Sequence, residues 1–314
     1  MNIGFSNFVG IDVSKDKVDM YSTLTSQHLT VENNIKALKK AFGKFDKNTF
    51  VVLENTGGYE NRCLKVLMDL KIRTHRTNNN MVKNFMLSLG NKAKTDSIDA
   101  RALSKFGSER HKELRLYEKP TKEQETMRES AKYLYFLKMQ RIMEKNHLQS
   151  PGCELIKEDI KETIKVLNGR IVEIEKKIDR IIKSDNVLEE RVKLLCQYKG
   201  IGKRTAIQLL AHLPELGILG RRSVAALSGV APHANDSGKK TGYRTTKGGG
   251  RPIVKRTLFL AALSACRYNE SIHSHYTKKT AEQGKKKMVA IVACMRKMIV
   301  QLNAAMRDGE LKTI

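Results

Sequence analysis

The chain has 314 residues, and its 59 lysines and arginines outnumber 33 aspartates and glutamates, for a formal charge of +26 and a pI near 9.9. This length predicts about two domains with a core each, and the residues from Gly200 onward hold 21 basic and six acidic side chains, or +15 of the excess. A polyanion is therefore the expected partner. No membrane partner is expected, because no apolar run approaches the roughly 20 residues that span a bilayer and the opening residues do not resemble a signal peptide.

Residues 1–112 alternate short β-branched runs with helical patterns, which predicts an α/β domain with a mixed sheet. The first two runs, Phe8–Val13 and Val18–Tyr21, are typical of a hairpin. The run at 50–53 is typical of a buried strand, and a further strand is expected at 72–77. Helices are predicted over 33–45 and around 64–70.

Residues 113–192 are predicted to form a long coiled-coil helical segment. Apolar residues recur there at alternating spacings of four and three, a heptad seam over three repeats, made of Ile160, Ile164, Leu167, Ile171, Ile174, Ile178 and Ile181. Gly169 interrupts the seam at a cost of up to about 1 kcal/mol relative to Ala. The charged segment before the break at Ser150–Gly152 fits either the returning arm of a helical hairpin or a dimeric coil.

Residues 193–314 are predicted to be helices joined by glycine-rich loops, ending in an amphipathic helix over 288–306. The sequence QYKGIGKRTAIQLLAHL is typical of a helix-hairpin-helix, in which Gly200 and Gly202 let the backbone approach a phosphate. An ordinary helix–helix turn is the alternative. Lys203 and Arg204 favour the DNA interpretation.

Four acids are candidates for chemistry. Asp12 ends one apolar strand and Glu54 ends another, so the two can lie side by side at one edge of the sheet. Asp96 and Asp99 are three residues apart, which on a helix places both carboxylates on one face. Clustered carboxylates repel unless a cation is present, and oxygen ligands suit Mg²⁺ or Mn²⁺. Two such ions can hold the attacking and leaving oxygens of a phosphodiester.

A basic region follows the helix-hairpin-helix, with ten basic residues and one acid, Asp236, between Leu216 and Asn269. Ser237 lies in its Lys- and Gly-rich loop, where a serine by itself is more often a turn residue than a nucleophile. Because Trp is absent and aromatics make up 6% of the chain, phosphate contacts are expected to outweigh base stacking. The predicted nucleic-acid contacts are Gly200, Gly202, Lys203, Arg204, Lys239, Lys240, Arg244, Lys247, Arg251, Lys255 and Arg256.

Together these motifs resemble the DEDD transposases of the bacterial insertion-sequence family numbered 110, which also includes Piv-type site-specific DNA invertases. The resemblance covers essentially the whole chain. GIDVSK carries the first D, LENTGGYE the E, and KTDSIDARAL the last two acids. The coiled coil, QYKGIGKRTAIQLLAHL, LSGVAPHANDSGK and TTKGGGRPIVKRTLFLAALSA then follow in the family's order.

The resemblance implies a RuvC-like domain with an RNase H fold, in which Asp12, Glu54, Asp96 and Asp99 bind divalent metal. It implies that Ser237 attacks a DNA phosphate and forms a covalent serine–DNA intermediate. Asp236 stands where the family often has a second serine, so Ser228 and Ser223 are the fallback nucleophiles. Because the acids and the serine lie on different domains, the resemblance implies a composite site between subunits of a dimer or tetramer.

The resemblance further implies double-stranded donor and target DNA, and for several members a structured bridge RNA that reads both. A Piv-like invertase and a RuvC-like junction nuclease that cuts with activated water are the enzymatic alternatives. A nucleic-acid scaffold with a decayed acid site is the non-enzymatic one, and four intact carboxylates argue against it. Five widely spaced cysteines, without metal-ligand or disulfide spacing, predict a reduced, cytoplasmic protein.

Overall fold

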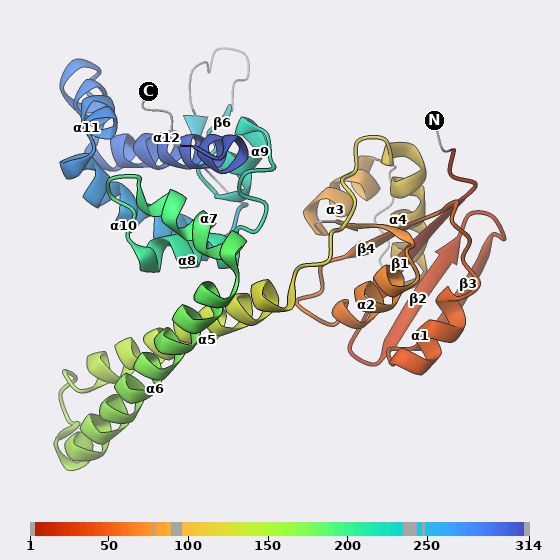
Figure 1. Cartoon of the computed structure of the whole chain (residues 1–314), viewed down its shortest axis with the longest axis horizontal. Helices are drawn as coiled ribbons and strands as arrows, with labels where there is room; N and C mark the ends of the chain where they lie inside the picture. The colour runs from red at the N-terminus through yellow and green to blue at the C-terminus, as the bar shows by residue number, and fades with distance from the viewer. Residues whose placement is uncertain (1–3, 78, 89–95, 235–243, 247–248, 311–314) are drawn as a thin grey trace. The chain divides into compact units, whose positions relative to one another are not determined.

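The computed structural model describes residues 4–77, 79–88, 96–234, 244–246 and 249–310. At 79, 80, 96, 97, 234, 244 and 245 it describes the backbone alone. The chain divides into two compact units, Met1–Lys119 and Pro120–Ile314 (Figure 1). Each unit is described by itself below.

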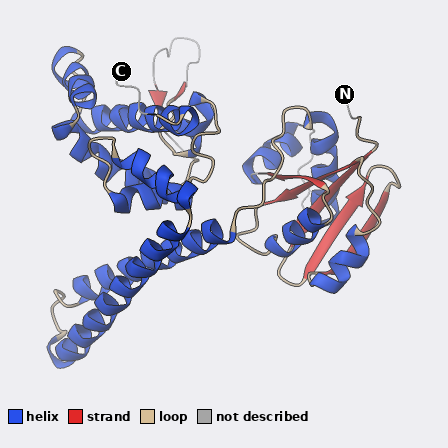
Figure 2. Cartoon of the chain, in the orientation of Figure 1, coloured by secondary structure: helices blue, strands red, loops and turns tan. Residues whose placement is uncertain are grey.

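The first unit is built on a five-stranded sheet with the order β3-β2-β1-β4-β5. Strands β1, β2 and β3 pair antiparallel, whereas β4 and β5 run parallel to β1 (Figure 2). The strands are β1 (Asn7–Val13), β2 (Lys17–Ser22), β3 (Gln27–Glu32), β4 (Thr49–Glu54) and β5 (Arg73–Thr77).

Helices cover both faces of this sheet, because β1 and β4 are apolar on both sides. On one face, Leu38 of α1 (Ile35–Phe42) and Leu67 of α2 (Asn61–Asp69) share a core with Ile11 and Leu53. On the other face, α3 (Asn79–Ser88) and α4 (Asp96–Arg110) pack on Phe50 and Val52. The alternation along β4 thus separates two cores.

The predicted elements of this unit are present within a few residues of their expected bounds. Three elements have no counterpart among those predicted from the sequence, namely the helices α3 and α4 and the strand β3. The side chains of β3 are almost all exposed, so this strand lacks the alternation of apolar and polar residues by which a strand is recognised. It forms because its backbone completes the ladder along β2.

The second unit begins with a long antiparallel helical hairpin of α5 (Lys122–His147) and α6 (Lys157–Ser184), joined through the short helix η1 (Glu154–Ile156) (Figure 1). Most of the heptad seam is buried against α5, including Ile171, which is 4% exposed, and Ile178, which is 1% exposed. Of the two alternatives left open by the sequence, the structure therefore has the helical hairpin. Helix α6 continues through Gly169 without a break.

The rest of this unit is a helical bundle with one short two-stranded sheet. Its elements are α7 (Asn186–Cys196), α8 (Lys203–His212), α9 (Arg221–Leu227), β6 (His233–Ala234), β7 (Arg244–Thr245), α10 (Pro252–Tyr268), α11 (Glu270–Thr277), the π-helical turn η2 (Lys278–Glu282) and α12 (Lys287–Asp308). The base of the hairpin shares one continuous core with these helices. The predicted coiled-coil segment 113–192 therefore belongs mostly to the same compact unit as the bundle. The boundary between the two units falls after residue 119, whereas the sequence predicts it after residue 112.

Helix α12 matches the predicted amphipathic C-terminal helix. Among the described residues it is the one helix long and apolar enough to cross a membrane by length and composition, whereas the sequence predicts no membrane span. Half of its most apolar window is buried, and Cys294, Met298 and Leu302 lie in the bundle core. It packs as the core helix of this unit.

Candidate active site

Asp12 and Glu54 are neighbours at the carboxyl edge of the sheet. Strands β1 and β4 are parallel, with Ile11 opposite Leu53, so the next step of the same register sets Asp12 beside Glu54. Directly adjacent residues in a sheet point to the same face. Both side chains are half-buried. The side-by-side arrangement expected from the two strand ends is thus present.

Helix α4 crosses the face of the sheet to which these two acids belong. A Cβ on Gly10 would collide with the backbone of Ala100 and Ser104 and lie 2.8 Å from Leu103 Cβ, so α4 lies directly on β1 there. A Cβ on Gly107 would lie 2.7 Å from Val52 Cγ2 and 3.7 Å from Phe8 Cδ1. Helix α4 therefore runs opposite to β1, and its N-terminus approaches the carboxyl edge.

The first turn of α4 carries Asp96 and Asp99. From the level of Gly10, two more residues of β1 advance about 7 Å, and four residues of α4 advance about 6 Å in the same direction. These steps bring the first turn of α4 to the level of Asp12. Asp99 is half-buried, and the side chain of Asp96 lies outside the described residues.

Asp19 is a further acid at this edge, and sequence reasoning missed it. It is the direct register partner of Asp12 across β1 and β2, so the two Cβ atoms are about 5 Å apart on one face. Asp19 is 9% exposed, accepts a hydrogen bond from Thr30 Oγ1 at 2.5 Å and lies 3.5 Å from His28 Nε2. The sequence contains the information needed to find Asp19, because the predicted hairpin, with its turn at 14–16, pairs position 12 with position 19.

The chemistry of the donors at this edge fits a hard divalent cation. Asp12, Glu54 and Asp99 offer only carboxylate oxygens, which Mg²⁺ and Mn²⁺ prefer. Among the side chains that the structure describes, which exclude Asp96, no three acidic, histidine or cysteine residues form a closed metal-binding group.

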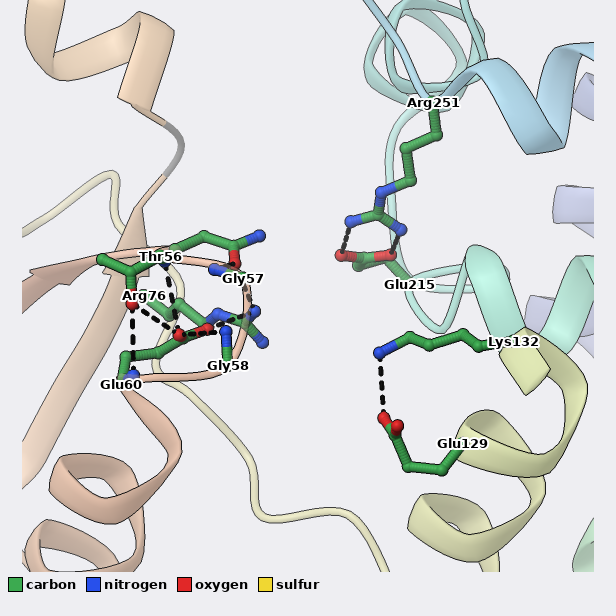
Figure 3. A network of polar contacts seen from close by, with 10 residues as sticks. Thr56, Gly57, Gly58, Glu60, Arg76, Glu129, Lys132, Glu215 and Arg251 are labelled. Atoms are coloured by element: carbon green, nitrogen blue, oxygen red, sulfur yellow. Dashed lines mark hydrogen bonds and ion pairs between the residues drawn. The ribbon is translucent and has the colours of Figure 1, made fainter. Parts of the chain in front are cut away.

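A buried carboxylate shapes the loop that follows Glu54 (Figure 3). Glu60 is fully buried and accepts hydrogen bonds from Thr56 Oγ1 at 2.8 Å and the Gly58 N–H at 2.7 Å. Its other oxygen lies 2.6 Å from Arg76 Nη2 on β5. Burial by itself would raise the pKa of Glu60, but the Thr56 hydrogen bond, the charge of Arg76 and the backbone donors outweigh it and lower that pKa. This ionised side chain makes the loop a rigid part of the edge.

The candidate serines differ in how much the structure says of them. Ser237 lies outside the described residues. Ser228, one fallback nucleophile, is fully buried, and its hydroxyl has no hydrogen-bond partner among the described residues. Ser223, the other fallback, is exposed on α9. Burial argues against Ser228, because DNA has no access to it in this conformation.

The described residues on both sides of the Ser237 segment are tied together. The short strands β6 and β7 pair His233 with Thr245. Beyond them, the Arg251 N–H donates to the Leu227 carbonyl at 2.8 Å, and a Cβ on Gly250 would collide with the backbone of Gly229. The close approach at Gly250, where φ is +79°, requires glycine.

Arg251 was predicted as a nucleic-acid contact, but its described contacts are within the protein (Figure 3). Both terminal nitrogens bind the Glu215 carboxylate at 2.7 Å, and one also donates to the His212 carbonyl at 2.7 Å. Burial would raise the pKa of Glu215, but the Arg251 hydrogen bonds and charge lower it overall. This fork-on-carboxylate pair anchors the start of α10.

We expect Arg251→Met to lower the free energy of unfolding by about 2 kcal/mol, because it leaves a half-buried carboxylate without its partner. The melting temperature falls by roughly 4–8 °C, and Arg251→Met/Glu215→Met recovers part of the loss. In the wild type the pair stabilises the fold above pH 4.5 and weakens as pH falls through the lowered pKa of Glu215. Thermal unfolding from pH 3 to 7 measures both effects. If Arg251→Met instead melts at the wild-type temperature, and the slope of its log DNA-binding constant against log salt concentration is reduced by about one, Arg251 is a phosphate contact.

The helix-hairpin-helix has the predicted form, with α7 and α8 joined at 197–202. Its two glycines have different roles. Gly200 has φ +106° and a Cβ there would lie 2.7 Å from Ala265 Cβ, so it packs the turn on α10. Gly202 faces open space at the start of α8 and remains the position where a phosphate can approach the backbone.

The two basic residues after this turn pair with acids of α6. Lys203 Nζ lies 2.8 Å from Asp179 Oδ1, and Arg204 Nη2 lies 3.1 Å from Glu175 Oε2. Both are well exposed, Arg204 with 78% of its side-chain surface accessible, so these are weak surface pairs. A phosphate can compete for either cation.

The remaining predicted contacts are only partly described. Lys255 is half-buried and Arg256 is exposed, on the first turns of α10. Arg256 Nη1 lies 3.4 Å from Tyr135 Oη on α5. Arg244 is placed on β7 by its backbone alone, and Lys239, Lys240 and Lys247 lie outside the described residues.

Two family models and two curated relatives resemble the chain. Residues 9–151 match a transposase family named for the DEDD acids and IS110, and residues 192–277 match the family described as "Transposase IS116/IS110/IS902 family". Over 312 residues the chain is 23% identical to each of two "Pilin gene-inverting proteins", from Moraxella bovis and Moraxella lacunata, with 96% of both chains covered. These matches define a DNA transposase/recombinase enzyme. The chain belongs to the IS110 family of transposases.

Proposed function

We propose that this chain excises an insertion sequence from double-stranded donor DNA and inserts it into double-stranded target DNA. The observation that carries the proposal is the match of both halves of the chain to IS110-type transposases, together with the strand-end acids at one sheet edge. The first unit is then a RuvC-like domain with an RNase H fold. Its mixed sheet is compatible with that fold, because β1, β2 and β3 form an antiparallel meander and β4 and β5 lie parallel to β1 on its other side.

In this proposal Asp12, Glu54, Asp96 and Asp99 hold Mg²⁺ or Mn²⁺. The bound metal would stabilise charge on the reacting phosphate and lower the pKa of the attacking hydroxyl. Two observations support this proposal: the register of β1 and β4 sets Asp12 beside Glu54, and the close approach of α4 to β1 at Gly10 directs the first turn of α4 toward the same edge. Asp19 adds negative charge beside Asp12 and strengthens the demand for a cation.

Ser237 is proposed as the nucleophile. Its Oγ forms a bond to a DNA phosphorus, and the bond from that phosphorus to a strand oxygen breaks. The proton of the serine hydroxyl ends on the departing strand oxygen, leaving a strand hydroxyl and a serine–DNA phosphodiester. Attack by a strand hydroxyl on that phosphodiester releases the serine and joins DNA to a new partner. One phosphodiester replaces another at each step, so the exchange needs no energy source.

We further propose that serine and acids from different subunits of a dimer or tetramer meet on the DNA. The seam of α6 is filled by α5 of the same chain, so a second copy would pack on outer faces of the hairpin. Phe136, with 53% of its surface exposed, and Tyr133, with 41%, lie on such a face. The charge of +26 supports simultaneous binding of DNA and a structured bridge RNA. A cytoplasmic, nucleoid-associated protein fits these partners.

Site-specific inversion is the second candidate function. It is favoured by the two pilin gene-inverting relatives, which align along nearly the full length of the chain. The chemistry would be the same, but it would act on two resident sites in one DNA molecule without a guide RNA. A junction nuclease cutting with activated water is the third reading, and it predicts no protein–DNA adduct.

The test is mass spectrometry of the peptide that contains Ser237, after the full-length protein with its co-purified RNA is incubated with donor DNA, target DNA and Mg²⁺. We expect a nucleotide adduct on Ser237, and we expect Ser237→Ala to form neither adduct nor recombinant DNA. Ser223→Ala is the matched control and retains both. Product maps from the same reactions distinguish insertion from inversion.

Recombination without an adduct on Ser237 would move the nucleophile to another serine or to water. DNA that is cut but never rejoined, with activity retained in Ser237→Ala, would favour the nuclease. Unchanged recombination after ribonuclease treatment would remove the bridge RNA and favour the invertase.

A further inference from the structure

A shallow hollow lies beside the acid edge of the first unit. It is lined by Lys15, Asp16, Gly58, Tyr59, Asn61 and Arg62. Lys15 and Asp16 lie in the loop after β1, the strand that carries Asp12, and Gly58 and Tyr59 lie in the loop after β4, which ends at Glu54. Asn61 and Arg62 are the first two residues of α2. We propose that this hollow binds the DNA strand next to the phosphate held at the acids, with one unpaired base on Tyr59 and flanking phosphates at Lys15 and Arg62. The inference rests on the proposed function of the acids.

The position of the hollow suits a strand that passes over the acids. Lys15 is three positions after Asp12, so their Cα atoms are at most about 11 Å apart. Tyr59 is five positions after Glu54, which allows at most about 18 Å. Neighbouring phosphates of one B-form strand rise about 3.4 Å along the axis. A strand leaving the acids therefore reaches the hollow within a few nucleotides.

The hollow is held rigid by buried polar contacts. Asn33, which is 4% exposed, donates from its side-chain amide to the Ser14 carbonyl at 2.9 Å and the Tyr59 carbonyl at 3.2 Å. One side chain thereby ties the two loops together. Arg62 Nη1 donates back to the Asn33 carbonyl at 2.9 Å, and Glu60 secures the second loop from inside. A preformed site loses little conformational entropy when a ligand binds.

The exposed side chains of the hollow fit a nucleotide. Tyr59 is 50% exposed and is the exposed aromatic residue among those described in the first unit. A ring at the surface next to an acid edge can stack on any unpaired base. Lys15 and Arg62 are exposed, and neither forms an ion pair within the part of the chain that the structure describes. Asp16 carries the one negative charge of the lining, so two cations face one anion.

The experiment measures binding of labelled oligonucleotides to the full-length protein by fluorescence anisotropy across a series of salt concentrations. The probes are a DNA duplex with a short unpaired stretch (gapped DNA), the same duplex fully paired, and a single-stranded RNA. We expect Tyr59→Ala to weaken binding of the gapped DNA about tenfold and Tyr59→Phe to change it less than twofold, because stacking needs the ring and not the hydroxyl. Binding of the paired duplex changes little in either variant.

We expect Lys15→Gln and Arg62→Gln each to reduce the salt slope for gapped DNA by about one. Lys47→Gln is the matched charge control, because Lys47 is exposed just before the amino end of β4, the end opposite Glu54. We expect the salt slope of Lys47→Gln to stay at the wild-type value. Equal affinities of Tyr59→Ala and wild type, or slopes unchanged in both cation variants, would overturn the proposal. A tenfold loss for RNA but not for gapped DNA would also overturn it, in favour of the guide RNA.

The binding test of the hollow and the adduct test of the proposed function can fail independently. The Ser237 adduct is measured in the wild-type protein, so it reports on the chemistry without involving the hollow. An adduct together with unaltered binding in Tyr59→Ala leaves the recombinase standing and removes the hollow. Loss of gapped-DNA binding in Tyr59→Ala without any wild-type adduct supports the hollow and removes the serine mechanism.

Discussion

Replacing Asp12 with asparagine is expected to abolish DNA strand exchange, lowering its rate at least a thousandfold, while the fold and nucleic-acid binding remain. Asp12 stands between Glu54 on β4 and Asp19 on β2, and so at the centre of the acid edge. Asparagine keeps the size of the side chain but removes the negative charge that a divalent cation requires. Strand exchange is measured with donor and target DNA, and binding with labelled duplex.

Thermal unfolding provides the readout that separates a metal site from a structural role. In metal-free buffer the carboxylates at this edge repel one another, so Asp12→Asn is expected to melt at the wild-type temperature or slightly above it. Mg²⁺ or Mn²⁺ is expected to raise the melting temperature of the wild type, because binding to the native state stabilises it. That rise is reduced or absent in Asp12→Asn.

Asp69→Asn is the matched control, because Asp69 is an exposed acid in a surface pair with Lys119. It is expected to keep full strand exchange and the full metal-dependent rise. A melting temperature many degrees below wild type in metal-free Asp12→Asn would make Asp12 a structural residue. Strand exchange at the wild-type rate in that variant would remove the acid edge from the mechanism.

At the acid edge of the sheet, the features that could be predicted from the sequence are those set by residues close together in the chain. The runs FVGIDV and FVVLE are apolar strands that end in an acid, and parallel strands bring such ends together. Asp96 and Asp99 share a helical face by spacing alone. Local pattern therefore sufficed for the two strands β1 and β4, whereas helix α4, which carries the other two acids, is not among the predicted elements.

The rest depends on partners that are distant in sequence. Asp19 becomes a neighbour of Asp12 only through the hairpin register. Arg251 lies in a basic stretch, which predicts a phosphate contact, but the hydrogen bonds described for its guanidinium include two to Glu215, 36 residues earlier. The heptad seam by itself is equally compatible with a dimeric coil, and in the structure α5 of the same chain packs on it. In each case the apolar or charged pattern is real, and tertiary contacts decide what it packs against.

Gly10 is the residue whose substitution tests how the acid edge is assembled. We expect Gly10→Ala to lower strand exchange about a hundredfold and the melting temperature by roughly 10 °C. The added Cβ meets the backbone of Ala100 and Ser104, which cannot yield by a side-chain rotation, so α4 has to move off β1 by an ångström or more. Overpacking of this kind costs about 3 kcal/mol. A displacement near 1 Å at reacting groups lowers rates about a hundredfold.

Two glycine variants calibrate this result. Gly107→Ala meets the tip of Val52 at 2.7 Å, farther along α4 from the acids, and a methyl group can move aside, so we expect a smaller loss of stability and near-normal strand exchange. Gly169→Ala meets nothing within 4 Å and is expected to stabilise α6 by up to about 1 kcal/mol with strand exchange unchanged.

The comparison among these variants is decisive because all three replace hydrogen with one methyl group inside a helix or strand. If Gly10→Ala folds with a lowered melting temperature but exchanges strands at the wild-type rate, the close approach of α4 to β1 does not position Asp96 and Asp99 for catalysis. If Gly10→Ala loses both strand exchange and the metal-dependent rise in melting temperature while Gly107→Ala keeps both, the acids of α4 and β1 act as one site. Helix α4 is then the element that completes the metal-binding edge, and Gly10 is what allows it to lie there.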